Sequence, residues 1–236
     1  MNNDQEAKIK QLIEEFTKEL VEVLRGLPSP EVNEIVVTAN RLDLKPFFDH
    51  IRKPLFPVPG KDFGRLTAKQ VSGHEDIIKE LKARGVPLPE AAYVLATAYH
   101  ETAKTMQPVR EGLKASDAWR KRNLRYYPWY GRGHVQLTWE ENYRKADQKL
   151  GLGGALVANP DLALDPEVSA QVLVLGSVQG WFSGDKKGRH TLARHIKTGT
   201  RAEYRQARRI INIMDKADLI AGHALVYKEA LQKAGY

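Results

Sequence analysis

Glu101 and Glu111 are the side chains in this sequence best suited to acid and base chemistry, and they lie ten residues apart (111 − 101). Glu101 follows the uncharged run Ala91–Tyr99, so we expect it at the end of a buried helix. Burial and the negative end of the helix dipole both disfavour a charged carboxylate, which would keep a proton available for general acid catalysis. The alternative is a glutamate at the rim of the fold, exposed to water or paired with an arginine.

Glu111 has a different sequence environment. Pro108 should end the preceding helix and begin a loop, and Arg110 and Lys114 surround Glu111 with positive charge. A carboxylate among cations should stay ionised, which is the state that a general base needs. Taken alone, Glu111 has the features of an ordinary surface loop residue. Two glutamates in contrasting environments, however, match the requirement of glycoside hydrolysis for one acid and one base.

The decapeptide Tyr130–Trp139 combines glycines with many hydrogen-bonding side chains. Aromatic residues at positions 126, 127, 129 and 130 can stack on sugar rings, although such residues also occur in cores. Gly131-Arg132-Gly133 is a poor dinucleotide-binding loop, because Gln136 occupies the position of the third glycine. The whole pattern favours a glycan-binding site.

Metal sites are not indicated by the histidines. A zinc-protease motif beginning at His100 would need a second histidine where Lys104 stands. His190 and His195 lack a convincing third ligand, and we expect them to be solvated surface residues. Cysteine is absent, which excludes thiolate ligands and cysteine nucleophiles. No metal or cofactor is therefore expected.

Positive charge is concentrated in two parts of this 236-residue chain, whose formal net charge is +8. Residues 110–132 carry seven basic and two acidic residues, and residues 185–209 carry nine and two, so the remainder is net −4 (8 − 5 − 7). This distribution favours an anionic partner such as a cell wall, or alternatively solvated helix faces. We expect no nucleic-acid partner, because no nucleic-acid-binding module is recognisable.

The sequence predicts a mainly helical (α+β) protein with an N-terminal appendage. Residues 4–25 form an amphipathic pattern, and residues 1–40 are expected to be this helix and a linker, ahead of a main domain at 43–236. The helices of that domain are predicted at 43–52, 67–84, 88–105, 116–123, 138–150, 166–182, 190–197, 201–213 and 216–233. The stretch 124–137 is the best candidate for a small sheet or hairpin.

Three helix starts carry recognisable capping signals. Thr67 with Gln70, and Thr138 with Glu141, fit the capping-box pattern, and Asp165 precedes a proline at the first helical position. No apolar run is long enough for a membrane span, and the N-terminus lacks the order of a secretory signal. We therefore expect the chain to be made in a cytoplasm and to reach any extracellular target by another route, and we expect it to be a monomer.

Several separate motifs resemble the family 19 glycoside hydrolases, a family that includes plant chitinases, and most closely its bacteriophage and prophage endolysins. They are His100–Ala103, Met106–Glu111, Tyr130–Trp139 with Asn142-Tyr143, Asn159–Leu162, Gly180–Phe182 and Ala207–Asn212. The resemblance covers about residues 43–233. It implies a lysozyme-like, two-lobed helical domain with a small β element.

The resemblance also implies roles for individual residues. Glu101 matches the acid, Glu111 the base of the phage-type members, and Thr138 the hydroxyl that holds the attacking water. The implied substrate-binding residues are His100, Tyr130, Arg132, Gln136, Asn142 and Asn212. Departures from the plant pattern include His134 in place of a proline and Trp129 in place of a tyrosine, which could alter the shape of the subsites.

The expected function is that of an endolysin, which hydrolyses β-1,4 bonds of bacterial peptidoglycan by an inverting mechanism with two carboxylates. One alternative is a chitinase acting on chitin. The other, from a different class, is a non-catalytic wall-binding or virion structural protein with the same fold.

Overall fold

The computed structural model describes residues 42–236, of which residues 44–236 form one compact unit. The predicted N-terminal helix and linker at 1–40 lie outside the described residues, and the boundary at residue 43 stays a prediction. None of the described helices is long and apolar enough to cross a membrane.

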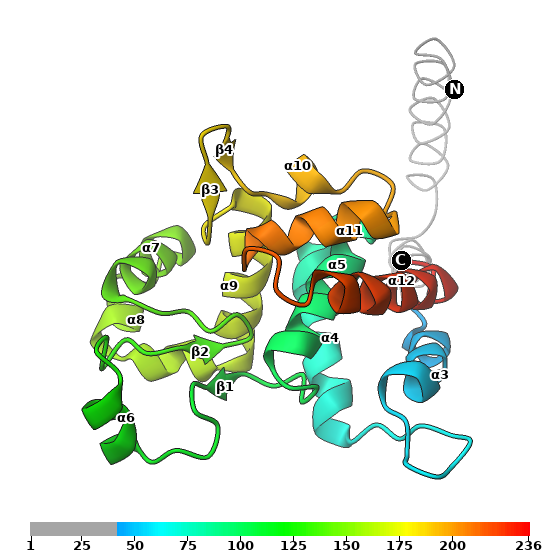
Figure 1. The fold of residues 1–236 in the computed structure, drawn as a ribbon, viewed down its shortest axis with the longest axis horizontal. Coiled ribbons are helices and arrows are strands. Elements are labelled where there is room, and N and C mark those ends of the chain that lie inside the picture. Colours follow the sequence, from blue (N-terminus) through cyan, green and yellow to red (C-terminus); the bar gives the residue numbers. More distant parts are fainter. Residues whose placement is uncertain (1–41) are drawn as a thin grey trace, which may run out of the picture. The chain divides into compact units, whose positions relative to one another are not determined.

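Helices make up most of the described chain (Figure 1). The α-helices are α3 (Leu44–Leu55), α4 (Ala68–Ala83), α5 (Leu88–Glu101), α6 (Asp117–Asn123), α7 (Glu140–Leu150), α8 (Ala155–Ala158), α9 (Pro166–Gln179), α10 (Leu192–His195), α11 (Arg201–Ala207) and α12 (Ala217–Lys233). Two 3-10 helices, η1 (Pro160–Leu164) and η2 (Arg208–Ile210), and four short strands, β1 (Val109–Arg110), β2 (Arg132–Gly133), β3 (Gly184–Asp185) and β4 (Gly188–Arg189), complete it.

α5 is the central helix of the core. Its residues from Ala91 to Tyr99 are all buried, as the uncharged run predicts. It packs against α12, α4 and α9, and α12 also packs against α3 and α11. Figure 1 shows α6, α7 and α8 on one side of α9, and α3, α5, α11 and α12 on the other. The predicted lysozyme-like, mainly helical fold class is confirmed.

The described part of the chain contains two sheets of two antiparallel strands each. β1 pairs with β2, with Val109 opposite Gly133 and Arg110 opposite Arg132. The segment 124–137 therefore contributes a strand as predicted, but its main partner is β1 rather than a neighbouring part of itself. The β3–β4 hairpin was not predicted, because its strands are only two residues long and carry no apolar alternation.

The helix starts agree with their capping signals in two of three cases. Thr67 and Gln70 form the expected capping box, and the Asp165 side chain accepts hydrogen bonds from two backbone amides. The prediction for Thr138 was wrong: the N-cap of α7 is Trp139, and the Thr138 hydroxyl donates to the carbonyl oxygen of Gln136 instead.

The end of α5 was predicted four residues too late. After Glu101, Ala103 and Lys104 adopt positive φ angles of 49° and 70°, which stops the helical hydrogen-bond pattern. The buried Thr102 hydroxyl donates to the Ala98 carbonyl and accepts from the Met106 amide, which fixes this exit from the helix. Glu101 is consequently the last residue of α5.

Candidate active site

Glu101 is held at the end of α5 by an arginine from another part of the chain. Arg208 Nη1 lies 2.6 Å from Glu101 Oε1, and Arg208 Nε donates to the Asp215 carbonyl over 2.8 Å. The side chain of Arg208 is only 2% exposed, and that of Glu101 is 18% exposed. The expected apolar setting of Glu101 is therefore corrected: its partner is a buried cation, the alternative named above. The carboxylate has a fixed orientation and a small accessible surface.

His100 is half-buried beside this ion pair. Burial lowers the pKa of its imidazole, the charge of Arg208 lowers it further, and the carboxylates of Glu101 and Asp215 oppose the shift. Near neutral pH, His100 is thus an uncharged group next to Glu101. This suits a hydrogen-bonding role better than a role as a positive charge.

Glu111 follows β1 directly, and all of its polar groups are hydrogen-bonded. Its carboxylate accepts from the Tyr126 hydroxyl over 2.6 Å and from the Gly131 amide over 2.9 Å. Its backbone amide donates to the Gly131 carbonyl, and its own carbonyl accepts from Arg120 Nε. Glu111 is therefore a fixed residue rather than a member of a free surface loop.

Tyr126 was not among the predicted site residues, and it is the principal partner of Glu111. The hydrogen bond to Glu111 raises the pKa of the Tyr126 hydroxyl to about 12, and burial contributes to the shift. The hydroxyl consequently stays protonated over the working range of an enzyme and acts as a donor. The sequence offered only the aromatic cluster as a signal, without a partner for any of its members.

Gly131 allows the polar groups around Glu111 to come together. A Cβ atom at Gly131 would lie 2.8 Å from Gln136 Oε1 and 3.1 Å from Glu111 Oε2. Gln136 Nε2 donates to the Val109 carbonyl, which holds the Gln136 side chain across β1. Glu111 and Gln136 therefore share one small space that only glycine leaves open.

Thr138 and Asn142 continue this network. The Thr138 hydroxyl donates to the Gln136 carbonyl over 2.7 Å, and Asn142 Nδ2 donates to the Thr138 carbonyl over 2.8 Å. Both side chains are partly exposed. The structure thus brings together four of the predicted residues: Glu111, Gln136, Thr138 and Asn142.

Tyr130 and Arg132 lie in the interior instead. Arg132 is 4% exposed, and its guanidinium donates to Asp161, to two backbone carbonyls and to the Tyr143 hydroxyl. Tyr130 is 1% exposed, lies under the Arg132 guanidinium and accepts from Arg110. These residues hold β2 in place. A direct contact of either with substrate stays a prediction that this burial does not favour.

Asp161 is a structural residue that the sequence did not single out. Arg110 donates to both of its carboxylate oxygens, over 2.6 and 2.8 Å, and Arg132 donates to one of them. These arginines hold the pKa of the Asp161 carboxyl below its usual value, although burial opposes the shift. The three charges connect β1, β2 and η1 behind the Glu111 network.

Asn212 belongs to the Glu101 side of the site. It is exposed, its backbone amide donates to the Arg208 carbonyl, and its side chain accepts from the Ile213 amide. The predicted residues therefore fall into two groups, one around Glu101 and Arg208 and one around Glu111. Figure 1 shows the chain running from the end of α5 to β1, and Glu101 is the last residue of α5 while Glu111 directly follows β1.

Three histidines have roles that the sequence did not predict. His134 is 1% exposed and bonds to Ser169 of α9, so it packs β2 onto the core rather than shaping a subsite. The expectation of solvation was wrong for His190, which is 6% exposed, and its Nδ1 lies 2.8 Å from Nε2 of the partly exposed His195. Among residues 42–236, no cluster of side chains is suited to bind a metal ion.

Comparison with known proteins adds independent findings. Residues 88–182, which carry both glutamates and the decapeptide, match the model of the family 19 glycoside hydrolases described as chitinase class I. The acidic 26 kDa endochitinase of Solanum lycopersicum and the acidic endochitinase pcht28 of Solanum chilense are each 49% identical to this chain over 55 residues. The aligned part is 23% of this chain and spans about a fifth, 19%, of each relative.

The crystal structure of chitinase C from Streptomyces griseus HUT6037 has a similar fold. It superposes with a TM-score of 0.52 on 82% of this chain and 76% of its own, at 21% identity. The likeness to chitinase C shows a similar fold, whereas the family match covers the segment that contains Glu101 and Glu111. The family match over residues 88–182 and the similar fold both agree with the resemblance of the sequence motifs to the family 19 glycoside hydrolases.

Proposed function

We propose that this protein hydrolyses β-1,4 glycosidic bonds of glycans that contain N-acetylglucosamine, with Glu101 as the general acid and Glu111 as the general base. The proposal rests on one observation: both carboxylates are held in fixed positions, one at the end of α5 and the other directly after β1. Glu101 is oriented by a buried arginine, and Glu111 by a tyrosine and a backbone amide. Such preorganisation is what a reaction with two carboxylates requires.

The assignment of acid and base follows the resemblance to the family 19 glycoside hydrolases, and the hydrogen bond of Thr138 decides how that residue can bind the water. Glu101 would donate a proton to the oxygen of the leaving sugar, and Glu111 would take one from a water molecule on the opposite side of the cleaved bond. Because the Thr138 hydroxyl hydrogen is already donated to the Gln136 carbonyl, its oxygen is left to accept. A water that donates to both Glu111 and Thr138 would direct a lone pair at the sugar carbon.

The substrate we propose is bacterial peptidoglycan, which would make the protein an endolysin that reaches the wall after release from a bacterial cytoplasm. The net charge of +7 in residues 185–209 supports this choice, because opposite charge attracts the protein to an anionic wall. Lys186 and Lys187 are exposed between β3 and β4. A chitinase is the second candidate, and the names of the two plant relatives and of chitinase C favour it.

Clearing of suspensions separates these candidates. Purified peptidoglycan and colloidal chitin are incubated with the protein, and turbidity is followed. Clearing of peptidoglycan supports the endolysin, and clearing of chitin alone supports the chitinase. Binding without clearing of either supports a non-catalytic wall protein. Mass spectrometry of the soluble products then identifies the cleaved bond and the sugar at the reducing end.

Product stereochemistry tests the mechanism. Inversion at a β-1,4 bond releases a product that is initially the α anomer, and NMR of fresh digests distinguishes it from the β anomer. The same mechanism expects the two carboxyl groups about 6.5–9.5 Å apart, with a water between them. An initial β anomer would contradict the role of Glu111 as a base acting on water.

A further inference from the structure

Trp139 is a large aromatic residue that the fold leaves on the surface. It is 41% exposed and has a φ angle of 72°. Its backbone is fixed, since its amide donates to the Trp129 carbonyl and its carbonyl accepts from the amides of Asn142 and Tyr143. A positive φ angle is uncommon for a bulky residue and is maintained only when the surrounding structure imposes it. The fold therefore holds this ring at the surface by a rigid backbone.

The neighbours of the ring connect it to the candidate base. The Tyr126 ring meets it edge-on, with centroids 4.9 Å apart, and the Arg125 guanidinium lies 5.2 Å from its centroid. Tyr126 is also the residue whose hydroxyl binds Glu111. Trp139 is thus separated from the Glu111 carboxylate by a single side chain, and it directly follows Thr138 in the chain.

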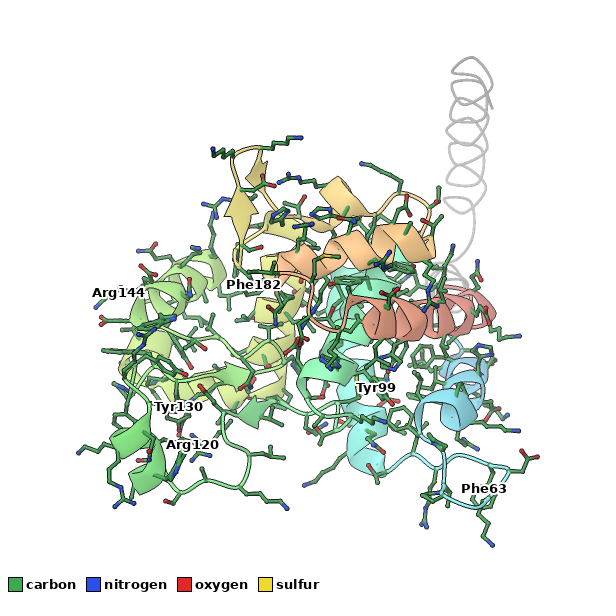
Figure 2. All side chains as sticks on the ribbon, viewed as in Figure 1. Phe63, Tyr99, Arg120, Tyr130, Arg144 and Phe182 are labelled. Carbon is green, nitrogen blue, oxygen red and sulfur yellow. The ribbon has the colours of Figure 1, made fainter. Side chains whose placement is uncertain are left out.

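A shallow, open hollow of about 520 Å³ lies against Trp139 and is lined also by Glu140, Glu141 and Arg144. Figure 2 labels Arg144, which lies on the same side of the domain as Tyr130. Arg144 donates from Nε and Nη2 to Glu140 Oε1, which fixes the Glu140 carboxylate. The hollow therefore combines an aromatic ring with two carboxylates, and the second oxygen of Glu140 and the Glu141 carboxylate are available to accept hydrogen bonds.

This combination matches the chemistry of a pyranose ring. The C–H groups on one face of a sugar pack on an aromatic ring, and the hydroxyl groups at its rim donate to carboxylates. We propose that Trp139, with Glu140 and Glu141, forms a binding subsite for an N-acetylhexosamine unit of the glycan strand, on the Glu111 side of the cleaved bond. The subsite rests on the proposed function, since it assumes that the substrate is a glycan of such units.

The consequence is a dependence on substrate length. A short oligosaccharide that occupies only the units next to the cleaved bond does not reach Trp139, whereas a longer one does. Loss of the Trp139 ring should therefore weaken the binding of long oligosaccharides and leave that of short ones nearly unchanged. Replacement by phenylalanine retains an aromatic surface and should preserve much of the affinity.

The test uses the full chain and chitin oligosaccharides as probes. Trp139→Ala and Trp139→Phe are compared with Phe63→Ala, which removes another exposed aromatic ring, 55% exposed, at the opposite end of the domain from Arg144 (Figure 2). KM is measured for the hexasaccharide and the trisaccharide, and circular dichroism checks folding. We expect Trp139→Ala to raise KM for the hexasaccharide roughly tenfold, equivalent to about 1.4 kcal/mol, and to leave the trisaccharide nearly unchanged.

A binding measurement separates failure of the subsite from failure of the proposed function. The same replacements are placed in a Glu101→Gln background, and Kd for the hexasaccharide is measured by calorimetry. If the wild-type chain cleaves no glycan, the proposed function fails, while a Kd that depends on Trp139 still supports the subsite. Equal values of Kd with and without the Trp139 ring overturn the subsite, whether or not the wild-type chain is active. Absence of hexasaccharide binding in Glu101→Gln overturns it as well.

Discussion

Each candidate catalytic carboxylate is oriented by one partner side chain. For Glu101 that partner is Arg208, a buried cation that would be left uncompensated by loss of the carboxylate charge. A glutamine at this position still accepts a hydrogen bond but cannot transfer a proton.

Glu101→Gln should therefore reduce hydrolysis by at least about 10²-fold, the lower end for loss of a general acid. It should also lower the free energy of unfolding by about 1–3 kcal/mol, because Arg208 loses its ion pair. Rates on a soluble oligosaccharide and urea unfolding measure the two effects. Glu90→Gln, in the first turn of the same helix, serves as the control and should leave the rate unchanged. A fully active Glu101→Gln protein would remove Glu101 from the mechanism.

For Glu111 the partner is Tyr126, whose hydroxyl holds the carboxylate in place by a hydrogen bond. Tyr126→Phe removes that bond, so kcat should fall by roughly tenfold, equivalent to about 1.4 kcal/mol, with a smaller change in KM, because orientation of the base is partly lost. Tyr127→Phe removes the adjacent hydroxyl, which binds Asp117, and should leave kcat unchanged. A wild-type kcat in Tyr126→Phe would show that this hydrogen bond does not position the base.

At the scale of elements, the starts of helices were predictable and their ends were less so. Thr67 and Asp165 act through hydrogen bonds to amides a few residues away, so a short sequence window contains the whole signal. The end of α5 depends on positive φ angles at Ala103 and Lys104, which are not residues that favour this conformation. The Thr102 hydroxyl, bonded to Ala98 and Met106, and the Gln70 side chain, which donates to the Lys104 carbonyl, hold that conformation, and the hydrophobic pattern does not record these bonds.

Arg208 is the first residue of the short η2 helix, directly after α11, and its side chain reaches Glu101 at the end of α5. The guanidinium binds Glu101 through Nη1 and the Asp215 carbonyl through Nε, which links α5 to the loop before α12. The single ammonium of lysine keeps the charge but does not reproduce this two-directional geometry.

Arg208→Lys should therefore lower kcat by roughly tenfold, an amount equivalent to about 1.4 kcal/mol, with a smaller change in KM, because orientation of the acid is lost while substrate contacts remain. Arg209→Lys is the matched control, since Arg209 donates from Nε only to the exposed Gln206 side chain. Steady-state kinetics of both variants measure kcat and KM. Equal kcat values would show that Arg208 contributes to folding alone.

At the scale of the whole domain, two buried histidines make stability depend on pH. Burial lowers the pKa of His74 and of His134 to about 4, whereas an unfolded histidine has a pKa near 6.5. Between these values the unfolded chain binds protons that the folded chain does not. Stability should therefore be complete above pH 6.5 and fall as pH decreases toward 4, by at most about 1.4 kcal/mol per pH unit for each histidine.

Urea unfolding between pH 7.5 and 4.5 measures this dependence. His134→Gln removes one of the histidines whose pKa is lowered, so the decrease in unfolding free energy with pH should be smaller than in the wild-type chain. An unfolding free energy that stays constant from pH 6.5 to 4.5 would contradict the assignment of neutral buried histidines.

The positive charge of the domain should act over a long range. Arg208 is buried in an ion pair, so the exposed charges of residues 185–209 lie elsewhere, including Lys186 and Lys187. Binding to whole peptidoglycan should weaken as salt shortens the screening length from about 10 Å at 0.1 M to 3 Å at 1 M. Cleavage of neutral chitin oligosaccharides should change much less. Equal salt sensitivity for both substrates would exclude a wall-directed role of this charge.

The site as a whole was predictable in its residue types but not in its connections. The decapeptide and the two glutamates could be found because their motifs are continuous in sequence. Arg208 and Tyr126 could not be assigned, because the Arg208 ion pair joins residues 107 positions apart and the Tyr126 partner follows from the fold of the loop after β1. Conversely, the motif did not show that Arg132 and Tyr130 are buried and hold β2, and a contact of either with substrate stays a prediction.

Gly131 offers a criterion for surveys of related sequences and for laboratory evolution. It carries no functional group, and its value lies in the missing Cβ, which would lie 3.1 Å from Glu111 Oε2 and 2.8 Å from Gln136 Oε1. Even alanine there would require the Gln136 amide and, by a few tenths of an ångström, the Glu111 carboxylate to shift, while every acidic and hydroxyl residue of the site remained in the sequence. Homologues with a side chain at this position should therefore be assayed for a reduced rate, because their glutamates alone do not establish an intact site. Libraries designed to broaden substrate range should leave this codon untouched.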